Sequence, residues 1–192
     1  MKNDIILSGV GGQGILSIAA TIGLAAVANN LFLKQAEVHG MSQRGGDVQS
    51  HLRISDKPVY SDLIPYGNAT LIISVEPMES LRYLPWLSKT GWLVTNSNPF
   101  VNIPDYPAID EIINEIKKIK NHIIIDADGI AKESGSARSG NMVILGAASS
   151  YIDMSYLSLE NAVIKLFERK GEDVIEANLK ALKAGRDFVL RT

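Results

Sequence analysis

The chain contains no cysteine. It therefore forms no disulfide bond, binds no iron–sulfur cluster through thiolates and offers no thiol nucleophile. It has only three histidines, His39, His51 and His122, and neither their spacing nor the acids around them form a metal-ligand set. We therefore expect no metal site built by this chain alone.

Long hydrophobic runs and a large excess of one charge are also lacking. The longest apolar-rich segment, residues 15–28, is too short to cross a bilayer. The formal net charge of −2 gives no electrostatic reason to expect a nucleic acid or an anionic membrane as partner. Asp4 and a strand-like apolar triplet follow the first residues directly, so we expect no signal peptide and a cytoplasmic protein.

What the sequence does have is a regular alternation of strand-like and helix-like segments over 192 residues. This length fits a single α/β domain, and no repeat or linker divides residues 1–192. The alternation predicts a doubly wound, mostly parallel, Rossmann-like sheet. Strands are expected at 4–8, 31–37, 71–75, 92–95 and 123–125, and helices at 15–28, 77–84, 110–120, 141–150, 158–167 and 172–184.

Residues 48–61 predict an antiparallel hairpin inserted after the second strand. Apolar and polar side chains alternate along 48–54, and Asp-Lys-Pro at 56–58 then turns the chain into residues 59–61. We expect the polar side chains, including His51 and Arg53, on a solvated face, with an extension of a positive surface as the alternative.

A glycine-rich string, GVGGQG at residues 9–14, lies between the first strand and the first helix. Glycine permits a tight turn and lets backbone N–H groups approach a ligand, and a helix N-terminus favours an anion. The alternative is a turn whose glycines serve only helix–sheet packing. For a dinucleotide, the acid expected after the second strand has only Glu37 as candidate, which argues against that ligand. The candidate phosphate- or carboxylate-binding residues are Gly11, Gly12, Gln13 and Gly14.

A second glycine-rich string, EVHGMSQRGG at residues 37–46, has no apolar periodicity and predicts a loop. Arg44 can grip a carboxylate or a phosphate with two hydrogen bonds, and His39 can donate a hydrogen bond or move a proton near neutral pH. A structural role for His39 in the loop backbone is an equal alternative. Because both glycine-rich loops follow strands, we expect them to line one edge of the sheet.

Three further polar residues are expected to have no role in binding or catalysis. His122 is expected to be an ordinary surface histidine. Asp126 and Asp128, which follow a predicted strand, are expected to form a turn or a helix cap rather than a metal site.

Several strings together resemble a known family, the gamma-type subunits of 2-oxoacid (pyruvate, ketoisovalerate or indolepyruvate):ferredoxin oxidoreductases. Within it, the sequence is most similar to the beta subunits of indolepyruvate ferredoxin oxidoreductase. The match runs through nearly the whole chain in order, and EVHGMSQRGG is long and specific. The matching strings lie at residues 9–14, 37–46, 50–53, 61–65, 76–82 and 141–146.

The resemblance implies oxidative decarboxylation of an aryl 2-oxoacid on thiamine diphosphate, acyl transfer to coenzyme A, and electron transfer through iron–sulfur clusters to ferredoxin. This chain lacks cysteine and the Gly-Asp-Gly signature of a diphosphate–magnesium site. Thiamine diphosphate, Mg and the 4Fe-4S clusters are therefore expected on a larger alpha subunit, through which ferredoxin is also reached. We expect no cofactor bound by this chain alone and no activity without that subunit.

The resemblance implies that this chain completes the active site formed mainly by the larger alpha subunit. His39, Gln43 and Arg44 would neutralise the substrate carboxylate or the phosphates of coenzyme A, with Gly45 and Gly46 beside the ligand. The alternatives are a subunit acting on another 2-oxoacid (pyruvate, 2-oxoglutarate or a branched-chain acid), a stand-alone nucleotide-binding module, and a scaffold subunit. A homodimer of the isolated chain also stays open.

Overall fold

The computed structural model describes residues 1–39 and 45–191. Its centre is a six-stranded sheet in the order β2-β3-β1-β4-β5-β6. Strands β1, β4, β5 and β6 run parallel to one another, whereas β3 is antiparallel to both β1 and β2. Five of the six strands therefore point in one direction. The bounds are β1 (Lys2–Val10), β2 (Phe32–His39), β3 (Asp47–Ser55), β4 (Ala69–Ser74), β5 (Leu87–Asn96) and β6 (His122–Ile125).

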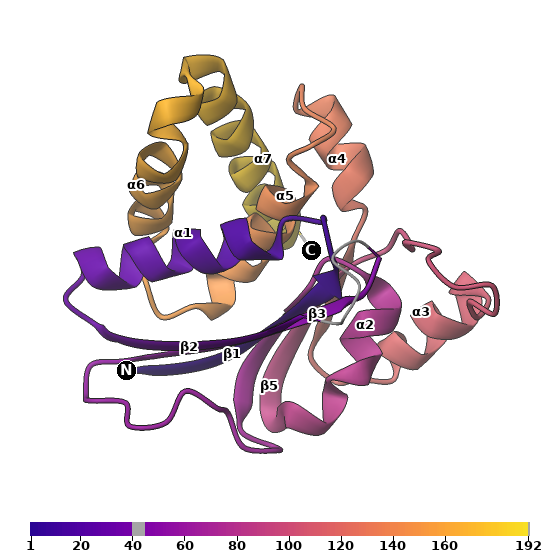
Figure 1. Cartoon of the computed structure of the whole chain (residues 1–192). Coiled ribbons are helices and arrows are strands. Elements are labelled where there is room, and N and C mark those ends of the chain that lie inside the picture. Colours follow the sequence, from indigo (N-terminus) through magenta and orange to yellow (C-terminus); the bar gives the residue numbers. More distant parts are fainter. Residues whose placement is uncertain (40–44, 192) are drawn as a thin grey trace.

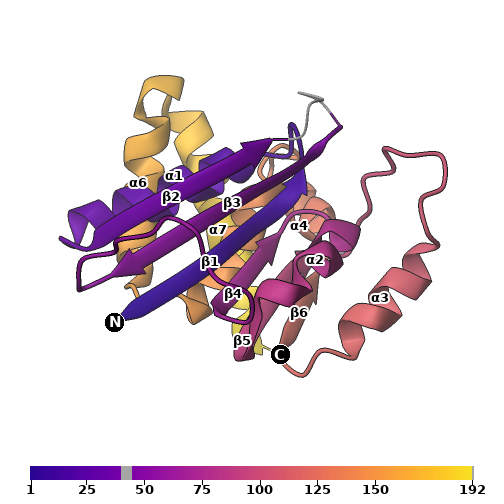
Figure 2. The same ribbon diagram turned by 60° about the horizontal axis from the view of Figure 1, so that its bottom comes forward.

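Helices cover both faces of this sheet (Figures 1 and 2). The larger layer comprises α1 (Ile15–Ala28), α4 (Ala127–Glu133), α5 (Gly140–Ala148), α6 (Tyr156–Phe167) and α7 (Glu172–Arg191). The smaller layer comprises α2 (Pro77–Arg82) and α3 (Ile109–Lys117). Short 3-10 turns lie at Leu84–Trp86, Ser149–Tyr151 and Glu168–Lys170.

The central strand β1 is buried on both faces, which explains its continuous apolar run. Ile5 and Leu7 pack under the larger helical layer, while Ile6 packs under the smaller one, and all three side chains are fully buried. Successive side chains of a strand point to opposite faces, so a central strand under two layers reads as apolar throughout. The doubly wound, mostly parallel fold predicted from the sequence is confirmed.

The predicted position of the hairpin was wrong. The antiparallel hairpin is β2–β3, joined across residues 40–46, and β3 lies between β1 and β2. Residues 56–68 do not form its second arm but leave the end of β3 and cross the face of the sheet. Alternating polarity identified β3 as a strand, but it could not identify which strand pairs with it.

The C-terminal helix is longer than predicted, because α7 continues past Gly185 to Arg191. Gly185 faces α5 rather than ending its own helix. A Cβ on Gly185 would lie 1.9 Å from the carbonyl oxygen of Val143, and a Cβ on Gly146 would lie 1.9 Å from that of Leu182. These two glycines thus allow the backbones of α5 and α7 to touch.

Candidate functional site

The winding of the chain reverses between the carboxyl ends of β1 and β4. These strands are parallel neighbours, yet the chain leaves β1 for α1 on one face and β4 for α2 on the other. Ligands of open α/β sheets bind at such a reversal, outside the carboxyl ends of the strands. A cavity of about 430 Å³ lies there, lined by residues that include Gly12, Gln13, Val75, Asn96, Asp128 and Asn141.

The glycine loop closes one side of this cavity. Gly14 caps α1 in a left-handed conformation (φ 82°), and a Cβ there would lie 2.5 Å from Nδ2 of Asn141, which donates to the Gly14 carbonyl oxygen at 3.1 Å. Gly12 is also at positive φ (101°), but a Cβ there would meet no atom of the described residues within 4 Å. Gly14 is therefore needed for packing, whereas Gly12 keeps space open beside the helix N-terminus.

Gln13 has a structural role within the glycine loop that the sequence did not indicate. Its Oε1 accepts a hydrogen bond from the backbone N–H of Val10 at 2.8 Å, so its side chain closes the loop on itself. Gln13 still lines the cavity.

A second cavity, of about 520 Å³, adjoins the first and shares Gly12, Gln13, Arg138 and Asn141 with it. It extends toward the start of α7, where Lys170 and Asp173 line it. The two cavities share one crevice, and among the described residues that line it are two cations, Arg138 and Lys170, and two acids, Asp128 and Asp173. Backbone N–H groups at a helix N-terminus together with cations favour a ligand bearing negative charge.

The described end of the second glycine-rich string, Gly45 and Gly46, lies beside the glycine loop at the same edge of the sheet, in keeping with the predicted arrangement. The backbone N–H of Gly11 donates to the carbonyl oxygen of Gly46 at 2.9 Å, just beyond the last β1–β3 residue pair. Nδ2 of Asn102 donates to the carbonyl oxygen of Gly45 at 2.6 Å. Gly45 and Gly46 therefore stand beside the glycine loop.

His39, Gln43 and Arg44 are the three residues predicted to be catalytic. Gln43 and Arg44 lie outside the described residues. His39 ends β2, with its backbone opposite Val48.

The acids after β6 act as a helix cap, as predicted. Oδ1 of Asp126 accepts from the backbone N–H of Gly129 at 2.9 Å, so Asp126 caps α4. Nδ2 of Asn98 donates to the same oxygen at 2.6 Å, and Nδ2 of Asn96 lies 3.5 Å from Oδ2 of Asp128. Across residues 1–39 and 45–191, no group of three or more histidine or acidic side chains is placed to hold a metal.

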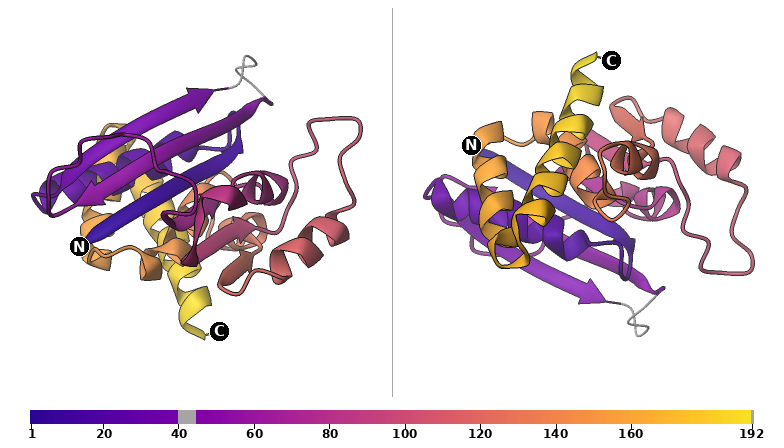
Figure 3. Two further views of the ribbon diagram at one scale, coloured as in Figure 1. Left: turned by 90° about the horizontal axis from the view of Figure 1, so that it is seen from below. Right: turned by 90° about the horizontal axis from the view of Figure 1, so that it is seen from above.

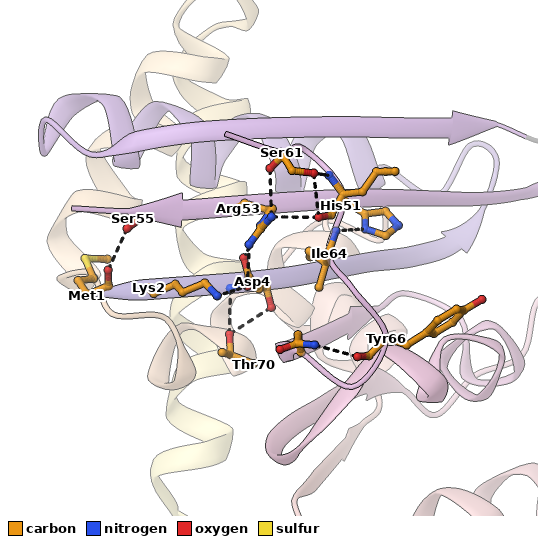
Figure 4. Close-up of polar contacts among 12 residues, drawn as sticks. Met1, Lys2, Asp4, His51, Arg53, Ser55, Ser61, Ile64, Tyr66 and Thr70 are labelled. Carbon is orange, nitrogen blue, oxygen red and sulfur yellow. Dashed lines mark hydrogen bonds and ion pairs between the residues drawn. The ribbon is translucent and has the colours of Figure 1, made fainter. Parts of the chain in front are cut away.

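The prediction of a solvated polar face on β3 was wrong (Figure 4). His51 is only 4% exposed, and its Nδ1 accepts from the backbone N–H of Ile64 at 3.0 Å. Nε of Arg53 contacts Oδ1 of the buried Asp4 at 2.7 Å, and its Nη1 donates to the carbonyl oxygens of Ser61 and Leu63. Residues 56–68 thus cover this face, and these side chains add no positive surface to the site.

Burial lowers the pKa of His51, in keeping with a neutral ring that accepts a hydrogen bond. His122, the third histidine, is half-buried, with Nδ1 2.6 Å from the carbonyl oxygen of Ile119.

A buried carboxylate beside the site was missed from the sequence. Glu76 is fully buried and caps α2 through the backbone N–H of Glu79 at 2.7 Å. Its other oxygen accepts from the backbone N–H of Phe100 at 3.3 Å and from the hydroxyl of Tyr106. Burial and this hydrogen bond raise the pKa of Tyr106. The Glu-Pro pair signalled a helix start, but nothing local signalled that Glu76 also anchors residues 97–108.

None of the helices within the described part of the chain is both long enough and apolar enough to cross a membrane.

Comparison with known proteins agrees with this architecture. Residues 4–188 match the family model of pyruvate ferredoxin/flavodoxin oxidoreductase. A relative in Archaeoglobus fulgidus, indolepyruvate oxidoreductase subunit IorB, is 37% identical over 192 residues, which is 96% of this chain and 94% of the relative.

Two solved structures share the fold. One is the gamma subunit of a keto/oxoacid ferredoxin oxidoreductase from Geobacter sulfurreducens, with a TM-score of 0.72 at 23% identity over 99% of both chains. The other is a 2-oxoglutarate:ferredoxin oxidoreductase from Magnetococcus marinus with 2-oxoglutarate, coenzyme A and succinyl-CoA bound. It has a TM-score of 0.77 at 23% identity and covers all of this chain, which spans only 31% of that longer chain.

Proposed function

Because the chain belongs to the pyruvate ferredoxin/flavodoxin oxidoreductase family, we propose that it is the beta (gamma-type) subunit of an indolepyruvate ferredoxin oxidoreductase. The complex would convert aryl 2-oxoacids to acyl-CoA and reduce ferredoxin. Residues 1–192 would be its single gamma-type domain. The identity of 37% over almost the full length of the Archaeoglobus relative supports the indolepyruvate branch over other 2-oxoacids.

The residue types in this chain support a distribution of the cofactors in which a second subunit holds them. Without cysteine, the chain cannot ligate 4Fe-4S clusters through thiolates, and it lacks the Gly-Asp-Gly signature of a diphosphate–magnesium site. Thiamine diphosphate would stabilise the carbanion formed on decarboxylation, and it would be held with Mg and the clusters by a larger alpha subunit, which ferredoxin would also contact. The present chain would be inactive alone.

The crevice is the part of this chain best suited to coenzyme A. Coenzyme A is long and carries phosphates, which fits two adjoining cavities with backbone N–H groups of the glycine loop at one end and Arg138 and Lys170 along the walls. The ligand-facing backbone positions would be Gly11, Gly12, Gln13, Gly14, Gly45 and Gly46.

The observation that carries this proposal is the hydrogen bond from Gly11 to Gly46, which joins the two glycine-rich loops at the carboxyl edge of the sheet. Because Arg44 is only two residues from Gly46 in the sequence, its guanidinium can act at this edge. Together with His39 and Gln43, it would neutralise the substrate carboxylate or a coenzyme A phosphate.

The test is Arg44→Ala in the reconstituted two-subunit enzyme. A preorganised charged donor contributes on the order of 3 kcal/mol to the transition state, so turnover should fall about a hundredfold. Indolepyruvate-dependent dye reduction measures turnover, and the KM values for coenzyme A and for indolepyruvate identify the affected ligand. Arg191→Ala, at the exposed end of α7, is the matched control and should leave turnover unchanged.

Unchanged turnover of Arg44→Ala in an intact complex would contradict the catalytic assignment and favour a scaffold subunit. Micromolar binding of a free nucleotide by the isolated chain, with no complex formed, would instead favour a stand-alone nucleotide-binding module.

A further inference from the structure

Residues 97–108, between β5 and α3, extend away from the body of the molecule (Figure 3). We call them the β5–α3 segment. Its tip carries exposed apolar side chains: Phe100 is 44%, Val101 67% and Ile103 43% exposed. Neighbouring apolar side chains held in solvent mark interaction sites more often than a single exposed residue does.

The β5–α3 segment is anchored at several points rather than held only by its ends. Asn98 donates to Asp126 at 2.6 Å, and the buried Glu76 accepts from the Phe100 backbone and the Tyr106 hydroxyl. Prolines at 99, 104 and 107 further restrict its backbone. A surface ordered before association loses less conformational entropy on binding.

The segment is also continuous with the proposed active-site edge. Nδ2 of Asn102 donates to the carbonyl oxygen of Gly45 at 2.6 Å, so this part of the segment lies beside the described end of the second glycine-rich string. A larger subunit that brings thiamine diphosphate to this edge has to approach the same surface. This continuity identifies the larger subunit, rather than an unrelated protein, as the occupant.

Charge gives the partner surface a chemical character. No lysine or arginine occurs between Lys89 and Lys117, whereas Asp105, Asp110 and Glu111 are exposed. The exposed apolar side chains are therefore followed along the chain by acids, Asp105 within the segment and Asp110 and Glu111 in the first turn of α3. Complementary surfaces steer association and set the register of docking.

We propose that residues 99–104 dock into an apolar pocket, bordered by lysine or arginine side chains, on the larger thiamine-bearing subunit. The inference rests on the proposed function, since that function supplies the larger subunit. It adds the surface by which the two chains recognise each other.

The experiment uses the co-expressed complex, purified and then diluted to measure the dissociation constant of the two chains by fluorescence-detected ultracentrifugation. The double variant Phe100→Ser/Val101→Ser removes the two most exposed parts of the tip. If they are central contacts, the dissociation constant should rise on the order of 100-fold. The matched control, Tyr60→Ser/Leu63→Ser, changes exposed apolar residues elsewhere, 93% and 56% exposed, and should leave it unchanged.

A second measurement does not depend on the stability of these variants. A photoreactive amino acid in place of Val101 should cross-link to the larger subunit, whereas the same substitution at Tyr60 should not. Association of the unmodified chains should also weaken as salt concentration rises, because acids follow the apolar side chains.

The outcomes separate this inference from the proposed function. Equal dissociation constants for the variant and the control, or cross-links from position 101 only to a second copy of this chain, would overturn the docking surface while leaving the subunit assignment in place. If the unmodified chain forms no complex with any thiamine-bearing subunit, the proposed function fails, and the docking surface with it.

Discussion

Alanine at two glycines of the same loop should affect two different properties, ligand binding at Gly12 and folding stability at Gly14. Gly12→Ala imposes a side chain on a residue at φ 101°, at a cost of about 1–2 kcal/mol, and meets no described atom within 4 Å. Gly14→Ala carries a similar backbone cost at φ 82°. It also places a Cβ 2.5 Å from Nδ2 of Asn141, so that side chain must move and lose its bond to Gly14. Overpacking and the lost bond bring the total to about 4 kcal/mol.

Binding of coenzyme A should be affected more by the change at Gly12 than stability is. Gly12 lines both cavities, and its added methyl group would meet no described atom within 4 Å. If coenzyme A binds there, the KM for coenzyme A should rise at least tenfold in the reconstituted enzyme while the chain still folds. Gly14→Ala should lose the same amount, about 4 kcal/mol, a large part of the stability of a domain, which is about 5–15 kcal/mol in all. Urea unfolding of the isolated chain and the KM for coenzyme A measure the two effects separately.

Either measurement can refute this reasoning. A KM for coenzyme A within twofold of normal in Gly12→Ala would mean that the open side of the loop does not face this ligand. Equal stability losses for both variants would mean that contact with Asn141 does not matter.

Three further predictions, made with four substitutions, test the packing and the buried groups. Gly146→Ala places a Cβ 1.9 Å from the carbonyl oxygen of Leu182 and should lower the free energy of unfolding by about 3 kcal/mol. In the control, Gly23→Ala, the nearest contact of the added Cβ is a side-chain end at 3.3 Å, so this change should be neutral or slightly stabilising. Equal urea midpoints for the two variants would contradict this prediction. Because burial lowers the pKa of His51, the unfolded chain takes up the proton first, so stability present above about pH 6.5 should fall as the pH drops further. His51→Asn should flatten that dependence in pH-resolved unfolding, and an unaltered slope would count against it. The phenolic oxygen of Tyr156 is buried with no hydrogen-bond partner among the described residues. Tyr156→Phe should therefore raise the free energy of unfolding by up to about 1 kcal/mol. A loss of stability of that size in thermal unfolding would disprove the reasoning.

Local chemistry made much of the fold predictable. The helix at 15–28 was predicted with its observed bounds, because a glycine string precedes it and paired asparagines follow its apolar run. The start of α2 at Pro77 followed from the preference of proline for the first helical position. Both signals depend on residues adjacent in sequence.

Long-range pairing was the part that sequence patterns could not supply. The alternation along β3 was recognised, but its partner strands were not, because period-two polarity is satisfied by any antiparallel neighbour. The same limit produced the error at His51. A polar row on a strand is expected in solvent, and only residues 56–68, folded back over it, make the row buried.

The candidate site follows the same division. The glycine string and the loop at 37–46 were identifiable because glycine and charged side chains cluster within a few residues. Asn102 was not identifiable, since its bond to Gly45 joins residues 57 positions apart. Asn141 reaches Gly14 from 127 positions away and was missed as a contact for the same reason.

The intervening strand β3 also explains why this glycine loop is ill-suited to a dinucleotide. In that type of site, an acid at the end of the second strand reaches the ribose bound beside the first. Here β3 lies between β1 and β2, and at about 4.8 Å per strand spacing this places Glu37 roughly 10 Å from the β1 backbone. The position next to the glycine loop is taken instead by Gly46, which accepts the hydrogen bond from Gly11. The same insertion that removes a ribose contact therefore places the described end of a second glycine-rich string, Gly45 and Gly46, beside the glycine loop at the carboxyl edge of the sheet.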